Sequence, residues 1–144
     1  MKRSVLKKIS KLPYAALLKK AARIFNAWIR ARDVKKLRGR CYTCSNKGSE
    51  AGHFRHNNNA TKFSEVFVNM QCSTCNRWKS GNLGVYALRL IKEHGLEKVQ
   101  ALEKASRKPK RFTKEELEQI IERYGKNSGS PDQGRAGSPD EGRI

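Results

Sequence analysis

The sequence predicts an α+β fold in which a small module built around two cysteine pairs lies between helical regions. Four cysteines form two C-x-x-C pairs, and apolar residues recur every three or four positions on both sides of them. The 144 residues are 37% hydrophobic, which provides only a modest core, and small domains of this kind often need an additional staple. We expect four regions, at 1–40, 41–82, 83–124 and 125–144.

The first region, 1–40, is predicted to be helical, amphipathic and basic. Its apolar residues define one helical face, namely Tyr14, Leu17, Leu18, Ala21, Ile24, Phe25 and Trp28. We expect this face to pack on the core. The region also carries fourteen Lys or Arg residues and a single acid, Asp33. Because so many positive charges repel one another, we expect an anion against them, and phosphate is the natural candidate.

The charge of the whole chain supports the same interpretation. A formal net charge of +19 indicates a polyanionic partner. Nucleic acid is favoured over a membrane because the sequence has no long apolar run, signal peptide or lipidation motif, and because Lys19 and Lys20 interrupt its N-terminal apolar stretch. We therefore expect an intracellular protein with no membrane partner.

The second region, 41–82, contains the two cysteine pairs, Cys41/Cys44 and Cys72/Cys75. In a secreted protein these pairs could form two disulfides. Without a signal peptide, one structural zinc ion is the better account, since each C-x-x-C turn presents two sulfurs to the same ion. Between the pairs, the β-branched and aromatic run KFSEVFVNMQC predicts a strand at about 63–70.

The third region, 83–124, is predicted to contain helices. The run NLGVYALRLIKEH is expected to form a helix that stops at a left-handed Gly95, and Thr113 with Glu116 forms a capping box that opens another. Two further helical faces are expected, one of Leu96, Val99 and Leu102 and one of Leu117, Ile120, Ile121 and Tyr124. The fourth region, 125–144, repeats GSPD and is predicted to be a disordered tail.

A constellation of histidine and asparagine residues lies among the cysteines, in SEAGHFRHNNN and directly after Cys75. The order His, Asn, Asn, framed by C-x-x-C pairs and ending directly after the last cysteine, is the layout of HNH, or ββα-metal, nucleases. His53 at the end of a strand can deprotonate a water for in-line attack on a phosphodiester. A divalent ion must neutralise the phosphate; Asn76 can ligate that ion while another Asn orients the imidazole. The predicted fold is thus a zinc-stapled ββα-metal module flanked by N-terminal and C-terminal helices.

Each of these residues also has a structural alternative. His53 can instead be a structural histidine or an additional zinc ligand, and Asn76 can simply cap the helix that follows the second pair. His56 fits a surface or DNA-facing position better than a catalytic one. His94 precedes Gly95 at a helix C-terminus, where positive charge is favoured, and we assign it no chemistry.

Six stretches carry a resemblance to a known family: FNAWIRARD at 25–33, CYTC at 41–44, AGHFR at 51–55, NMQCSTCNRWKSGN at 69–82, then VYALRLIKEHGLEKVQALE and FTKEELEQIIERY. In this order and spacing, about residues 15–124 resemble the NinG/Rap family of lambdoid-phage recombination nucleases. The resemblance implies an HNH-like endonuclease that acts on branched DNA, Holliday junctions and D-loops, in the cytoplasm of a bacterial host.

Two positions depart from the family pattern. An Asn common five residues before the second cysteine pair is Phe67 here, and Asn69 is its expected substitute. The Asp that many HNH enzymes carry before the histidine is Gly52 here. Glu50 is its expected substitute, joining Asn76 as a ligand of catalytic Mg²⁺ or Mn²⁺. The expected catalytic residues are therefore His53, Asn69 and Asn76.

The leading prediction is a structure-specific, metal-dependent DNA endonuclease. The residues expected to contact DNA are Arg30, Arg32, Lys35, Lys36, Arg38, Arg40, Arg55, Arg77, Lys79 and Asn82. The alternative is a noncatalytic zinc ribbon that only binds nucleic acid and needs neither His53 nor Asn76. A third reading is a phage assembly or host-modulating factor on a degenerate HNH scaffold. A homodimer would supply two active sites for symmetric cutting of a four-way junction.

Overall fold

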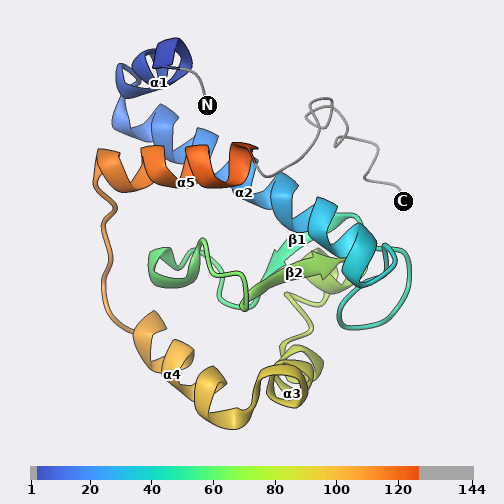
Figure 1. Ribbon diagram of the computed structural model, residues 1–144. Helices are drawn as coiled ribbons and strands as arrows, with labels where there is room; N and C mark the ends of the chain where they lie inside the picture. Colours follow the sequence, from blue (N-terminus) through green and yellow to red (C-terminus); the bar gives the residue numbers. More distant parts are fainter. Residues whose placement is uncertain (1–2, 127–144) are drawn as a thin grey trace.

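The computed structural model describes residues 3–126 and confirms a mixed α+β class (Figure 1). Its elements are α1 (Arg3–Ser10), α2 (Tyr14–Lys36), β1 (Glu50–His53), the 3-10 helix η1 (Asn59–Thr61), β2 (Val68–Gln71), the π-helical turn η2 (Thr74–Trp78), α3 (Leu83–His94), α4 (Leu96–Ser106) and α5 (Lys114–Lys126). Apart from residues 125 and 126, which end α5, the tail predicted to be disordered lies outside the described residues.

The two strands form one antiparallel sheet, in which Gly52 pairs with Asn69 and His53 pairs with Val68. Helix α2 contacts both strands. The second strand is shorter than the predicted 63–70 and begins at Val68. The reason is a turn in which the Ser64 hydroxyl accepts hydrogen bonds from the backbone N–H groups of residues 66 and 67. These N–H groups are then not available for hydrogen bonds to a neighbouring strand.

The N-terminal helical face packs as predicted. Leu17, Ala21 and Phe25 of α2 are fully buried, and α5 lies across the N-terminal half of α2 (Figure 1). The buried residues of α5, Leu117, Ile121 and Tyr124, meet this face. The predicted capping box is present, since the Thr113 hydroxyl accepts from the Glu116 N–H and the Glu116 carboxylate accepts from the Thr113 N–H.

Helices α3 and α4 cover the other side of the central module. Tyr86 and Leu90 of α3 are fully buried in a cluster with Tyr42, Phe54, Phe67 and Val99. Helix α3 ends at His94 because Gly95 has φ 91° and ψ 149°, a positive φ outside the left-handed helical region that the sequence predicted. Leu96 departs from the predicted face of α4, since about half of its surface is exposed. Within residues 3–126, no helix combines the length and the apolar character needed to cross a membrane.

Candidate functional site

The four cysteines converge at one point, as the sequence predicted. Their sulfur atoms all lie within 4.8 Å of one another, and Cys44 Sγ is 3.7 Å from Cys72 Sγ. Zn–S bonds of about 2.3 Å in a tetrahedron separate the sulfurs by about 3.8 Å, so this spacing fits a zinc ion. The donor set can therefore hold a metal such as zinc. No other group of three His, Cys, Asp or Glu side chains within residues 3–126 is arranged to do so.

The surroundings of the sulfurs differ, since burial raises the pKa of the Cys44 thiol to about 12 and also raises the pKa of Cys72, whereas Cys41 has the opposite shift. Burial acts to raise the pKa of the Cys41 thiol, but hydrogen bonds, first from the Thr43 hydroxyl, lower it to about 7. The side-chain amide of Asn82 lies 3.6 Å from Cys75 Sγ. Asn82, which we expected to contact DNA, is thus directed at one of the sulfurs that could bind the metal, and its φ of 50° sets the start of α3.

A surface pocket of about 540 Å³ lies beside the end of β1. It is lined by Ala51, His53, His56, Asn57, Lys62, Asn76, Arg77 and Ser80. The structure therefore brings the predicted base, His53, and the predicted helical ligand, Asn76, to the same hollow. His56, which we expected to face the surface or DNA, is exposed at this pocket.

A backbone carbonyl orients the His53 ring. Its Nε2 lies 3.3 Å from the backbone carbonyl of Lys62, and because a carbonyl only accepts, Nε2 carries the proton. In a neutral ring with that proton, Nδ1 is the nitrogen with the acceptor lone pair. Burial lowers the pKa of His53 despite backbone hydrogen bonds at Lys62 and Ala51, which act to raise it, so the ring is neutral near pH 7. The orienting group is a backbone carbonyl and not the asparagine that the sequence analysis expected.

Asn76 and Glu50 form a second polar group at this site. Asn76 Nδ2 donates to Glu50 Oε1 at 2.8 Å, which leaves Asn76 Oδ1 as the atom able to bind a cation. Glu50 also accepts from the Ser73 hydroxyl at 2.8 Å and pairs with Arg77 at 3.0 Å. Burial acts to raise the pKa of Glu50, but these hydrogen bonds and the Arg77 charge hold it below its ordinary value, so the carboxylate is ionised.

Asn69 does not reach His53. Residues that follow one another in a strand point to opposite faces, so Asn69, which pairs with Gly52, lies on the face opposite to His53. Its side chain is buried, accepts from Arg32 Nη2 at 2.9 Å and donates to the Val66 carbonyl at 2.9 Å. This placement corrects the expectation that Asn69 joins the catalytic group, and gives it a role in holding β2 to α2.

Packing also explains the missing Asp before the histidine. A Cβ atom at Gly52 would lie 1.9 Å from Gln71 Oε1, so no side chain fits there without moving Gln71. Phe67, at the place of the family Asn, is fully buried against Phe54 and Tyr86. Both departures belong to the core of the module.

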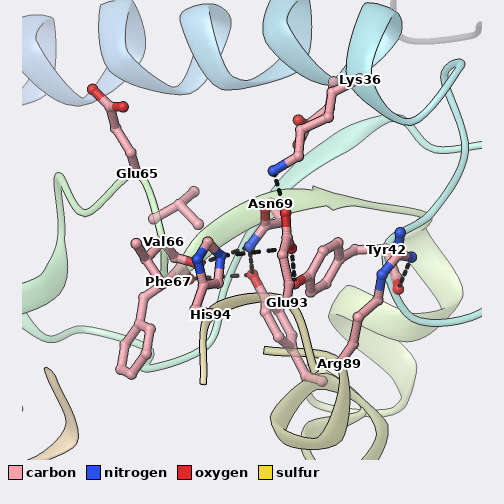
Figure 2. A network of polar contacts seen from close by, with 12 residues as sticks. Lys36, Tyr42, Glu65, Val66, Phe67, Asn69, Arg89, Glu93 and His94 are labelled. Atoms are coloured by element: carbon pink, nitrogen blue, oxygen red, sulfur yellow. Dashed lines mark hydrogen bonds and ion pairs between the residues drawn. The ribbon is translucent and has the colours of Figure 1, made fainter. Parts of the chain in front are cut away.

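Several basic residues predicted to contact DNA are bound to protein partners. Lys36 pairs with Glu93 at 2.6 Å, and the Tyr42 hydroxyl donates to the same carboxylate at 2.6 Å (Figure 2). Arg89 of α3 donates to the Tyr42 carbonyl at 2.6 Å, so this network ties α2 and α3 to the first cysteine turn. Arg32 is also committed, since its guanidinium is paired with Asp33 and bonded to β2.

The remaining predicted DNA contacts differ in exposure. Arg55 pairs with Glu103, and Arg77 pairs with Glu50 but stays largely exposed. Arg30 is half-buried. Lys35, Arg38, Arg40 and Lys79 are exposed as well.

A second basic surface was missed from the sequence. Residues 107–111, RKPKR, link α4 to α5 and are all exposed. The amides of Asn58 and Asn59 donate to the carbonyls of Ser106 and Lys110, which holds this linker beside the pocket-lining loop at 56–57. The run of four cations in five residues was a visible signal, but only the fold places it near the pocket.

Known proteins similar to this chain come from bacteriophages. The family model described as "Bacteriophage Lambda NinG protein" matches residues 2–130. "Protein ninG" of Salmonella phage P22 and of Escherichia phage lambda are each 34% identical over 121 residues, covering 83% of this chain and 59% of the relative. The same protein of Escherichia phage 933W is 34% identical, with 60% of its length covered. The chain thus spans about three-fifths of these relatives. No solved structure matches it.

Proposed function

This chain belongs to the NinG family of bacteriophage proteins, and we propose that it is a metal-dependent DNA endonuclease that cuts branched recombination intermediates such as Holliday junctions and D-loops. The observation that carries the proposal is the pocket wall formed by His53. His53, a neutral imidazole whose Nε2 lies within hydrogen-bond distance of a carbonyl, lines the same hollow as Lys62 and Arg77. Phosphodiester hydrolysis needs that combination of a base and cations.

In the proposed reaction, Nδ1 of His53 takes a proton from a water whose oxygen attacks the phosphorus, and the ester oxygen opposite to it leaves. Lys62 and Arg77 neutralise charge on the phosphate from the pocket wall. Asn76 and Glu50, whose side chains touch, are the residues that would hold Mg²⁺ or Mn²⁺. When bound, such an ion supplies charge neutralisation and stabilises the leaving oxygen.

In this proposal the cysteine cage has a structural and not a catalytic role. Four thiolates leave no open position for a water or substrate on a tetrahedral zinc ion. The strand order β1, β2 followed by the helical segments η2 and α3 supports a ββα-metal arrangement. The zinc would then hold the second strand and η2 in register.

One observation favours the noncatalytic alternative. The Glu50 carboxylate is engaged by three side chains, and Gly52 offers no ligand beside His53. A protein that only binds nucleic acid through its zinc module needs no carboxylate free for a catalytic ion. The two functions therefore differ in their dependence on His53.

The test compares His53→Ala with the parent protein on labelled four-way junction and linear DNA, with and without Mg²⁺ or Mn²⁺. Loss of a general base should slow cleavage by about 10²–10⁴-fold. Junction affinity should not change, because phosphate contacts dominate it. His94→Ala is the matched control, since His94 lies on α3 outside the pocket lining. If the parent cuts nothing with either ion, or His53→Ala cuts as fast as the parent, the binding-only function replaces the nuclease.

A further inference from the structure

Trp78 is the most exposed large apolar side chain in residues 3–126, with 83% of its surface accessible. Tryptophan is usually among the most buried residues on average. The contrast with Trp28 is clear, because Trp28 packs against Phe25 and Tyr124. Within the described part of the chain, no ring and no cation stacks on Trp78. Trp78 therefore exposes a large apolar surface to water, with no aromatic or cation–π contact among residues 3–126 to offset it.

The backbone that carries the indole is fixed, and it lies next in sequence to residues of the candidate pocket. Trp78 ends η2, and its sequence neighbours Arg77 and Ser80 line the pocket. The turn is fixed at both ends, since the Asn76 N–H donates to the Cys72 carbonyl at 3.0 Å and the Lys79 N–H donates to the Thr74 carbonyl at 2.9 Å. An aromatic ring on a rigid turn loses little conformational freedom when it binds a ligand.

The surroundings of Trp78 favour a nucleobase as its ligand. Arg77 and Lys79, on either side of it, are both exposed, so a partner must bring negative charge close to an apolar face. An unpaired strand does this, because each base offers a π-face and each linkage a phosphate. A second copy of this chain is disfavoured, since it would bring two highly basic molecules, each with a net charge of +19, into contact.

We infer that Trp78 stacks on an unpaired base of the DNA substrate and so places the neighbouring phosphate at the His53 pocket. In a continuous duplex the bases are stacked on one another and their faces are covered. A branch point or a single-stranded arm exposes them. The inference rests on the proposed function for the identity of the substrate, and it adds a reason why branched DNA is preferred to a plain duplex.

Fluorescence tests the inference directly. Trp28 and Trp78 are the two tryptophans of the chain, so a Trp28→Phe variant leaves Trp78 as the one indole reporter. The probes are an oligothymidylate of about twelve nucleotides, within the range of single-strand site sizes, and a blunt duplex of equal length. The indole emission should be quenched by the oligothymidylate and remain nearly constant with the duplex.

Affinity provides the second readout, in the otherwise unmodified chain. Stacking on one base is worth roughly 1–3 kcal/mol, so Trp78→Ala should weaken oligothymidylate binding by about 5-fold to 150-fold. Trp78→Phe should retain most of the affinity, and duplex binding should change little in either variant. Leu88→Ala is the matched control because Leu88 is also an exposed apolar residue, at 71%, but lies on α3.

Three results would overturn the inference. The first is Trp78→Ala binding the oligothymidylate as tightly as the parent does. The second is an equal loss of affinity for the oligothymidylate and for the duplex in Trp78→Ala, which would indicate a general phosphate contact. The third is a parent that dimerises through Trp78, seen as a smaller mass by light scattering in Trp78→Ala. Because these assays measure binding, they stay independent of the His53→Ala cleavage assay, and either proposal can fail alone.

Discussion

Replacing Arg32 by alanine should destabilise the fold and leave the proposed DNA-binding surface unchanged. Arg32 Nε and Nη2 pair with Asp33 at 2.7 and 2.9 Å, and Nη1 donates to the Glu65 carbonyl at 2.8 Å. The Asp33 side chain is fully buried and 18% of the Arg32 side chain is exposed. The pair therefore belongs to the interior contact between α2 and β2, although its residue types resemble a phosphate-binding surface.

The magnitude follows from what remains after the guanidinium is removed. Asp33 keeps the backbone N–H of Met70, at 2.8 Å from its Oδ2, as a donor to its side chain. Leaving a buried charge without its ion partner costs about 3–5 kcal/mol. Domains of this size have a total stability of roughly 5–15 kcal/mol, so Arg32→Ala should lose a large part of it.

The assay is denaturant unfolding of the zinc-loaded protein, with Lys35→Ala as the control on the same helix. Lys35 is exposed, and its replacement should change the free energy of unfolding by no more than about 0.5 kcal/mol. The double variant Arg32→Met/Asp33→Asn should recover part of the loss, because it removes the unpaired charge. The reasoning would be refuted if Arg32→Ala were as stable as Lys35→Ala and instead flattened the salt dependence of DNA binding.

Four further outcomes are expected. If Lys35 and Arg38 each contact a phosphate, replacing either by alanine should reduce the slope of log binding constant against log salt concentration by about 0.9 on duplex DNA. Anisotropy titrations that show the parent's slope would exclude that contact. Cys72→Ser should have a lower melting temperature than the zinc-loaded parent, and elemental analysis should find less zinc in it. An unchanged melting temperature, with no zinc found in the parent, would contradict a zinc site at the four cysteines. Cleavage by Glu50→Ala should be restored by raised Mg²⁺ or Mn²⁺, and a defect insensitive to the ion would remove Glu50 from the metal site. The cleavage rate should follow the titration of His53, because the neutral base accumulates as pH rises. Since the pKa of His53 is lowered, the rate should rise with a midpoint below the ordinary 6.5 and then level off. A midpoint above 6.5 would contradict the assignment.

The lowered pKa of His53 also determines how the stability of the folded protein changes with pH. The folded protein holds the proton less tightly than the unfolded chain, so the contribution of His53 to stability is complete above the unfolded pKa and is lost as pH falls through the folded one. Glu50, with its lowered pKa, acts in the same direction but in a more acidic range. Denaturant titrations of His53→Ala should therefore show a weaker loss of stability below pH 6.5 than the parent shows.

Local and periodic features were predictable from the sequence. The stripe on α2, the capping box at Thr113 and the two cysteine turns each depend on residues a few positions apart, so spacing alone specifies them. The pocket residue His53 was also found this way, because it lies in a short segment framed by the cysteines.

Features that depend on register or on the backbone were not predictable. Whether Asn69 shares a face with His53 is decided by the pairing of Gly52 with Asn69, and a shift by one residue would have reversed the answer. His53 is oriented by the backbone carbonyl of Lys62. Because every residue has such a carbonyl, the sequence does not show which one will meet the histidine. Arg32 has the residue type of a phosphate ligand, and only its contacts across more than thirty positions reveal a structural role.

The geometry connects the metal cage to the candidate site through very few bonds. Cys75 is followed directly by Asn76, whose N–H donates to the Cys72 carbonyl, so the second cysteine turn sets the position of η2. Both polar groups that η2 supplies to the pocket, Asn76 and Arg77, bond to Glu50 of β1. The helix packing of α2 against α5 lies elsewhere and involves none of these bonds. Loss of zinc should therefore disturb Asn76, Arg77 and Trp78 before it affects the helical core, so that under the proposed function the cage serves DNA recognition as well as folding.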